Sequence, residues 1–205
     1  MKKQIVLFLL LAICSIGLKS QKHKSLFAQK PTNWEIIIAD KSKIANQVFS
    51  FENNILKVGS ASAGYIRTKK SYYNYTLELE WRWLKKAGNS GVLVHIQPKD
   101  SIWPVCFQIQ QKATAAGDII CMNGLNANEC VDKIKFTIPK MTDSNEKQTG
   151  EWNSMKVISK NGTLTVYING TLQNKATGLT AKKGYIGFQG EGTEMEFRNL
   201  FIYKK

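Results

Sequence analysis

Arginine, histidine and proline are scarce in this 205-residue chain. It has four prolines, two histidines and three arginines (Arg67, Arg82 and Arg198), so lysine supplies nearly all of the positive charge behind its formal net charge of +14. Lysines spread along every segment are typical of a solvated surface. Nucleic-acid binding favours clustered arginines interleaved with stacking aromatics, so the composition predicts no nucleic-acid partner. Loose, salt-sensitive attraction to anionic cell-surface polymers fits the charge better.

Motifs for a zinc site are absent as well. The histidines and cysteines show no Cys-x-x-Cys or His-rich spacing, so nothing in the sequence indicates zinc. Beyond residue 20, the cysteines are Cys106, Cys121 and Cys130. Cys121 and Cys130 flank a loop-like stretch, and in an oxidising compartment we expect a disulfide between them, with Cys106 as a buried thiol. Three free thiols, or a different pair, are the alternatives.

Long apolar runs are absent after residue 20. The only one, residues 5–18, follows Lys2 and Lys3 and precedes the small residue Ser20. This run is too short and too poorly flanked for a stable transmembrane span, and the pattern is typical of a secretory signal peptide over residues 1–20. We therefore expect a secreted or periplasmic protein with no stable membrane insertion.

The N-terminal region also bounds the domain organisation. Cys14 follows Ile13 rather than a small residue, so a lipid-anchored protein is the weaker alternative. Residues 21–30 are polar and basic, and we expect them to form a flexible leader. Residues 31–205 are then one domain, long enough to bury a substantial core.

Short alternating segments fill this domain, and none has a convincing helical period. The pattern predicts an all-β fold, a two-sheet antiparallel sandwich or jelly roll. The expected strands are residues 34–38, 48–51, 55–58, 65–68, 75–84, 92–97, 105–110, 118–122, 152–159, 163–168, 185–189 and 195–203. The side chains expected mostly inside are Trp81, Trp83, Val92, Val94, Phe107, Ile109, Val166, Ile168, Ile186, Phe188 and Phe197, and Trp34 and Trp152 are also expected in the core.

Three segments, in chain order, resemble one known family. They are Asn89–His95 followed by Val105–Gln110, then Gly150–Asn153 followed by Leu164–Gly170, and finally Gly184–Tyr203. Together they are similar to the 3-keto-disaccharide hydrolase domain family over about residues 26–203. The resemblance implies a concanavalin-like jelly roll that acts on a carbohydrate ligand. Two positions depart from the family pattern, with His95 where Arg is common and Gln108 where Glu is common.

The activity implied by the resemblance is cleavage of 3-keto-glycosides by elimination and hydration. A ketone at C3 acidifies the C2 proton, so the reaction needs a general base and a donor or cation for the developing enolate. A divalent metal is one candidate for that cation, but the sequence gives no ligand set. The departures at His95 and Gln108 favour the alternative of a non-catalytic carbohydrate-binding module. A cell-surface structural protein is a third hypothesis, and monomer and homodimer both stay open.

Strand alternation selects the candidate site. It puts polar side chains on the same face of three segments that we expect to be neighbours. We therefore expect one pocket on the outer face of one sheet, with two further residues at its rim. The pocket residues are His95, Glu80, Arg82, Gln108 and Gln110, and the rim residues are Trp103 and Glu191.

The expected roles follow from side-chain chemistry. His95 or Glu80 would act as the base, and Arg82 would stabilise the enolate. The two glutamines and Glu191 would bind the sugar, and Trp103 would stack on it. For His95 a structural hydrogen-bonding role is the alternative, and for Glu80 and Arg82 a surface ion pair.

Overall fold

The computed structural model describes residues 24–27, 31–99 and 101–204. The predicted signal peptide and most of the predicted leader lie outside the described residues. The helical segments are short: a 3-10 turn at Pro31–Asn33 and helix α1 at Ala45–Val48. No helix in the described ranges is long and apolar enough to cross a membrane.

Within the described residues, sixteen strands form two antiparallel sheets, as the alternation predicts. Their bounds are β1 Lys24–Ser25, β2 Trp34–Ile38, β3 Phe49–Glu52, β4 Ile55–Val58, β5 Gly64–Thr68, β6 Tyr72–Tyr73, β7 Tyr75–Trp83, β8 Gly91–Ile96, β9 Phe107–Gln110, β10 Ile119–Cys121, β11 Thr137–Ile138, β12 Asn153–Lys160, β13 Thr163–Ile168, β14 Thr171–Ala176, β15 Lys183–Gly190 and β16 Met195–Lys204. Twelve of them overlap the expected strands, while β1, β6, β11 and β14 were not expected.

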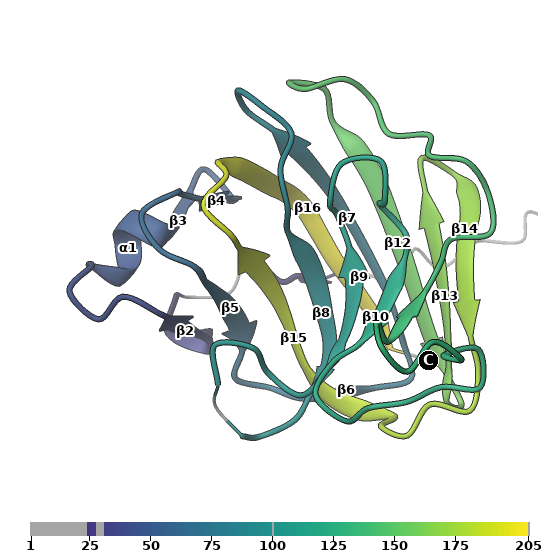
Figure 1. Cartoon of the computed structure of the whole chain (residues 1–205). Coiled ribbons are helices and arrows are strands. Elements are labelled where there is room, and N and C mark those ends of the chain that lie inside the picture. The colour runs from purple at the N-terminus through teal and green to yellow at the C-terminus, as the bar shows by residue number, and fades with distance from the viewer. Residues whose placement is uncertain (1–23, 28–30, 100, 205) are drawn as a thin grey trace, which may run out of the picture.

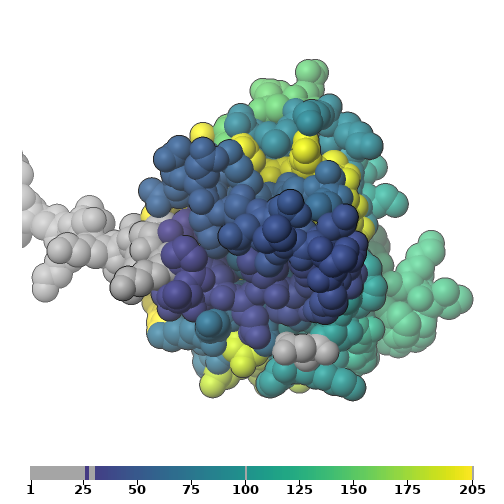
Figure 2. Space-filling model, turned by 90° about the vertical axis from the view of Figure 1, so that its left-hand side faces the viewer, coloured from purple at the N-terminus to yellow at the C-terminus, as the bar shows by residue number. Residues whose placement is uncertain are grey.

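The sheets pack face to face as two layers (Figure 1). Sheet A has the order β14-β13-β12-β7-β16-β4-β3, and β1 also pairs with β16. Sheet B has the order β11-β10-β9-β8-β15-β5-β2, and β6 also pairs with β15. The predicted all-β jelly-roll class is therefore confirmed. On one side of the sandwich, the N-terminal segments around β2, α1 and β3 cover the edge of both layers (Figure 2).

The core fills the space between the sheets. All eleven side chains predicted to be mostly inside are buried, and Trp34 is buried with them. An aromatic cluster of Phe27, Trp34, Phe51 and Phe188 ties β2 and β3 together across the layers, with ring centroids 5.6–6.3 Å apart. Burial on this scale is the main stabilising contribution to a two-layer fold.

Three expectations about the fold need correction. Residues 24–27 of the predicted flexible leader are ordered, because β1 pairs with β16 and Leu26 and Phe27 pack in the core. Trp152 lies outside the core, on the outer face of sheet A, because it directly precedes the inward-facing Asn153. Cys121 and Cys130 are free thiols instead of a disulfide. Burial, together with a hydrogen bond to Cys130, raises the pKa of Cys121 to about 12.

Candidate functional site

His95 lies between the two sheets and not in a surface pocket. Its backbone φ is +53°, and the pairing of β8 with β15 shifts between Tyr185 and Gly187. This irregularity breaks the alternation on which the prediction depended. Ile96 packs on the outer face with Leu93, while the imidazole of His95 packs edge-on against the interior rings of Tyr75 and Phe107.

The imidazole of His95 bridges the layers as a neutral group. Its Nδ1 lies 2.9 Å from the carbonyl oxygen of Ala181, which can only accept, so Nδ1 carries the proton. Its Nε2 accepts from the Ser159 hydroxyl of sheet A, also at 2.9 Å. Burial lowers the pKa of His95 to about 4. Its predicted place in a surface pocket is therefore wrong, and the structural alternative describes it.

Glu80 and Arg82 lie on the outer face of sheet A. Arg82 donates from Nε and Nη2 to Glu196 at 2.9 and 2.8 Å. Glu80 accepts from Arg198 and, at 3.0 Å, from Asn199. The two residues thus pair with neighbours on β16 and not with each other.

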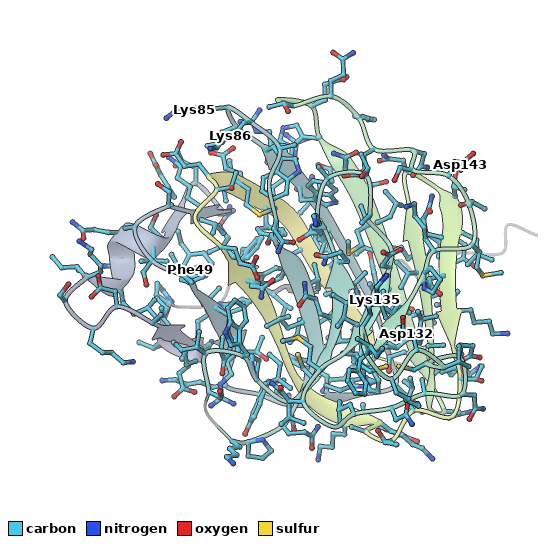
Figure 3. All side chains as sticks on the ribbon, in the orientation of Figure 1. Phe49, Lys85, Lys86, Asp132, Lys135 and Asp143 are labelled. Carbon is cyan, nitrogen blue, oxygen red and sulfur yellow. The ribbon has the colours of Figure 1, made fainter. Side chains whose placement is uncertain are left out.

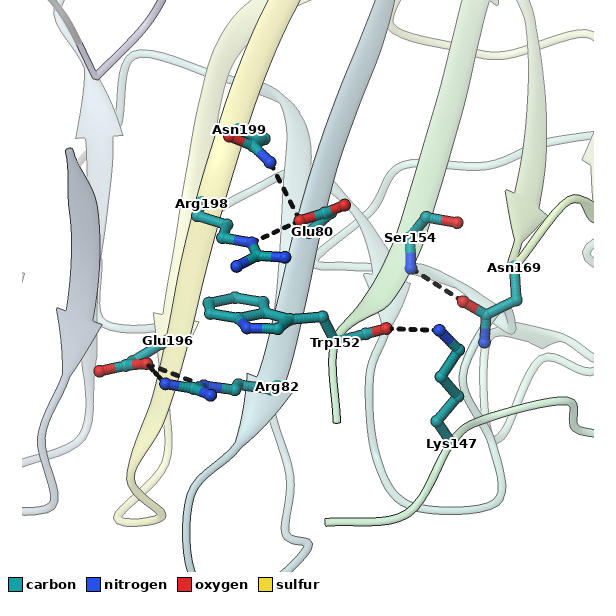
Figure 4. A network of polar contacts seen from close by, with 9 residues as sticks. All are labelled: Glu80, Arg82, Lys147, Trp152, Ser154, Asn169, Glu196, Arg198 and Asn199. Atoms are coloured by element: carbon teal, nitrogen blue, oxygen red, sulfur yellow. Dashed lines mark hydrogen bonds and ion pairs between the residues drawn. The ribbon is translucent and has the colours of Figure 1, made fainter. Parts of the chain in front are cut away.

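The ring of Trp152 lies between the two guanidinium groups of this network (Figure 4). Arg82 is 4.5 Å and Arg198 is 4.0 Å from the ring centroid, distances typical of cation–π contacts. The sandwich separates this surface from Gln108 by about 10 Å of packed side chains. The predicted single pocket is therefore wrong, because alternation sorts the faces of a strand but does not say to which sheet the strand belongs.

Gln108 and Gln110 do share the outer face of sheet B. Gln108 Nε2 donates to Gln110 Oε1 at 3.1 Å, and the same oxygen accepts from the backbone N–H groups of Gln111 and Lys112. Gly91 lies opposite Gln110 and makes room for the pair, since a Cβ there would lie 2.5 Å from Gln108 Cγ. The glutamines are 4% and 8% exposed, so they form the floor of this surface.

The ends of β8 and β15 bring four more polar residues beside these glutamines. Asn89 donates from Nδ2 to the Glu191 carboxylate, and the Ser90 hydroxyl donates to the Gln189 carbonyl oxygen at 2.7 Å. We call Asn89, Gln108, Gln110, Gln189 and Glu191 the sheet B polar cluster. Its member Asn89 belongs to the β7–β8 connection, whose residues Lys85 and Lys86 stand out from the molecule (Figure 3).

Glu191 is the titratable group of the cluster. Partial burial raises its pKa, while the hydrogen bond from Asn89 and the positive charge of Lys112 act in the opposite direction. A carboxyl group with a raised pKa is a stronger base once it is ionised, which suits proton abstraction.

Two acceptors of the cluster lack donors among the described residues. They are the buried Oδ1 atom of Asn89 and Oε1 atom of Gln189, whose side chain is 2% exposed. A buried acceptor without a donor costs free energy, so such atoms are rare and often mark a place where a ligand or water binds. Sugar hydroxyls are donors of the kind that these oxygens need.

Several residues of this surface were not predicted. Gln189 directly follows the core residue Phe188, so the alternation along β15 is a signal that could have identified it. Asn89 was expected only to shape the start of its strand. Further along the same face, Arg67 pairs with Glu35 at 2.8 Å and lies 4.4 Å above the ring of Tyr185.

The remaining predictions concern Trp103 and a metal. Trp103 lies in the β8–β9 loop with its side chain 43% exposed, and Asn123 fixes its backbone carbonyl with a 2.6 Å hydrogen bond. Its place at the rim of a sugar site stays a prediction. Within the described ranges, no three His, Cys, Asp or Glu side chains are grouped to hold a metal ion.

Comparison with known proteins identifies the family. Residues 22–203 match the family model of the 3-keto-alpha-glucoside-1,2-lyase-like domain. No curated protein matches the chain.

Solved structures share the fold at low sequence identity. A candidate glycosyl hydrolase from Parabacteroides distasonis has 20% identity and a TM-score of 0.65, covering 90% of this chain and 100% of its own. The carbohydrate-binding module CBM66 from Bacillus subtilis has 11% identity and a TM-score of 0.62 (84% and 96% covered). A β-glucanase from Bacillus licheniformis has 16% identity and a TM-score of 0.59 (88% and 96% covered). The chain belongs to the 3-keto-alpha-glucoside-1,2-lyase-like domain family.

Proposed function

We propose that this protein is a carbohydrate-active enzyme that binds its sugar at the sheet B polar cluster and cleaves 3-keto-glycosides. One observation carries the proposal: the strands that resemble the family's motifs meet at a carboxyl group of raised pKa beside two buried acceptors without donors. The carbohydrate-related neighbours and the family match support the substrate class. Export from the cytoplasm rests on the predicted signal peptide alone.

The proposed reaction begins with proton abstraction. The Glu191 carboxylate takes the proton from C2, which the neighbouring C3 ketone has made acidic. The electron pair of the C2–H bond forms a C1–C2 double bond as the bond from C1 to the leaving oxygen breaks, and that oxygen takes a proton from water. Lys112, close enough to lower the pKa of Glu191, offsets negative charge at the C3 oxygen. Asn89 holds the carboxylate in place.

Hydration completes the cleavage. The hydroxide left when water protonated the leaving oxygen adds to C1 of the double bond, and Glu191 returns its proton to C2. This releases the 3-keto sugar and restores the Glu191 carboxylate. Rotation of the Asn89 and Gln189 side chains would turn their unpaired oxygens, Oδ1 and Oε1, toward sugar hydroxyls, which fixes the ring over the Gln108–Gln110 floor. The neutral Gln108 stands where the family often has Glu, so the base in this chain is assigned to Glu191.

A non-catalytic carbohydrate-binding module is the second candidate. It is favoured by the two positions that depart from the family pattern. The amide of Gln108 is hydrogen-bonded to Gln110, and His95 is buried away from the surface. In that case the same cluster would bind a sugar without turning it over. Glu80 and Arg82, on the opposite sheet, belong to neither version of this site.

Turnover of 3-keto-trehalose and 3-keto-glucosides by the purified protein, with and without a chelator, tests the proposal. We expect release of the aglycone or second sugar, and a loss of about 10²-fold in Glu191→Gln. Glu80→Gln is the matched control, because it changes a carboxylate on the other sheet, and its turnover should stay unchanged. Binding without turnover that is lost in Gln110→Ala would favour the binding module. Neither binding nor turnover would contradict both candidates.

A further inference from the structure

A groove of about 680 Å³ runs over the outer face of sheet A, on the opposite side of the sandwich from the polar cluster. Side chains of β7, β12, β13 and β16 line it. The lining residues that matter to the argument are Glu78, Glu80, Lys156, Tyr167, Asn199 and Phe201.

Four of these side chains form one row across the sheet. Phe201 pairs with Glu78, Glu78 with Lys156, and Lys156 with Tyr167 in the strand register. Neighbouring strands are about 4.8 Å apart, so the two aromatic residues stand roughly 14 Å from each other at the two ends of the row. This span suits a short oligosaccharide better than a single sugar ring.

The polar groups between the aromatic ends are held in place. Lys156 forms a 3.1 Å ion pair with Glu78, which also accepts a 3.0 Å hydrogen bond from the Tyr203 hydroxyl. Aromatic faces pack on the C–H faces of sugar rings, and carboxylates and amides bond to their hydroxyls. The row therefore combines the two kinds of contact that a sugar chain uses.

An irregularity in β16 adds an amide to this surface. The pairing of β16 with β7 shifts between Arg198 and Phe201, and Asn199 has a φ of +52°. The Asn199 side chain consequently donates to Glu80 at the groove, while Leu200 is buried. Bulges that re-aim a side chain in this way are common beside binding sites.

The charges of the groove are balanced. Lys156 pairs with Glu78, and Arg198 pairs with Glu80, so each carboxylate of the lining has a cation beside it. A strongly charged polymer would meet as many repulsive as attractive charges here. A neutral sugar chain, whose hydroxyl groups both donate and accept, finds partners of both kinds.

We propose that this groove is a second, non-catalytic site that binds a neutral oligosaccharide or glucan chain. It would hold the protein on a polymer while the sheet B polar cluster acts on sugar at the other face. The site does not depend on the proposed enzymatic activity, because its residues lie on the other sheet.

Native affinity gels containing laminarin, dextran or alginate test this inference. We expect at least one of the neutral glucans to retard the wild-type protein more than the anionic alginate does. Tyr167→Ala and Phe201→Ala should each weaken that affinity by about fivefold, since one stacking contact contributes on the order of 1 kcal/mol. Both residues lie on the outer face and are only partly buried, and thermal melting of each variant is the check that it folds.

Glu191→Gln is the matched control, and it should leave the retardation unchanged while it lowers turnover of small 3-keto-glycosides. Conversely, Tyr167→Ala should leave that turnover unchanged, so failure of one proposal is distinguished from failure of the other. The inference is overturned if neither glucan retards the wild type, or if both aromatic variants are retarded as strongly as the wild type. Loss of turnover in Tyr167→Ala with normal retardation would also overturn it, because the groove would then be part of the catalytic site.

Discussion

The buried imidazole of His95 should make the protein lose stability in mild acid. Its pKa is about 4 in the folded state, against 6.5 for the ordinary group. Between these values the unfolded chain binds a proton that the folded chain does not, so the free energy of unfolding falls as the pH falls through this window. At 1.36 kcal/mol per pKa unit, the shift corresponds to about 3 kcal/mol, fully present above pH 6.5 and lost by about pH 4.

Urea unfolding of the wild type and of His95→Asn at pH 7.5 and pH 4.5 measures this contribution. Asn tolerates the positive φ at this position and does not titrate. The carboxylates titrate in the wild type and in the variant alike. The difference between the unfolding free energies of the two proteins therefore isolates the contribution of His95. We expect the wild-type advantage to shrink by about 2–3 kcal/mol at the lower pH. Parallel pH dependence of the two proteins, or a His95 NMR titration near pH 6.5, would refute the reasoning.

Three further predictions follow from the structure. The rate of 3-keto-glycoside cleavage should fall as the pH drops through the raised pKa of Glu191, and a pH–rate profile should show this limb above the usual range of glutamate. Phe107→Ala and Phe197→Ala should each cost about 3–5 kcal/mol in denaturant unfolding, because both rings are fully buried, and a cost below about 1 kcal/mol would contradict that packing. Trp152→Ala should lower the free energy of unfolding by only about 1 kcal/mol, since it removes two surface cation–π contacts. A loss in denaturant unfolding as large as that of the two phenylalanine variants would contradict the surface position of Trp152.

The fold was predictable because its strands alternate almost without fault. On β7, the inward Leu77, Leu79, Trp81 and Trp83 are buried and the outward Glu78, Glu80 and Arg82 are only partly covered. The Asn161–Gly162 pair, both with positive φ, forms the tight turn between β12 and β13 that this dipeptide predicts. Such local signals fix where strands begin and end.

The candidate site was predictable only in part, since it depends on information that alternation does not carry. One limit is the assignment of strands to sheets: β7 joins sheet A while β8 and β9 join sheet B, which separates Glu80 and Arg82 from Gln108 and Gln110. The other limit is backbone irregularity. The positive φ of His95 reverses the face of one side chain, and no turn residue in the sequence indicates it.

The two outer faces are independent because of what lies between them. Each face carries its polar side chains on strands whose inward neighbours pack in a single apolar core, and close-packed interiors resist small displacements. Substitutions on well-separated surfaces that share no partners usually have additive effects. Residues on the outer face of one sheet can therefore differ from the family pattern, as Gln108 does, without disturbing the groove on the other sheet. On the proposal that the groove binds glycan, a family member without turnover would still bind it, and one scaffold could serve both an enzyme and a binding module.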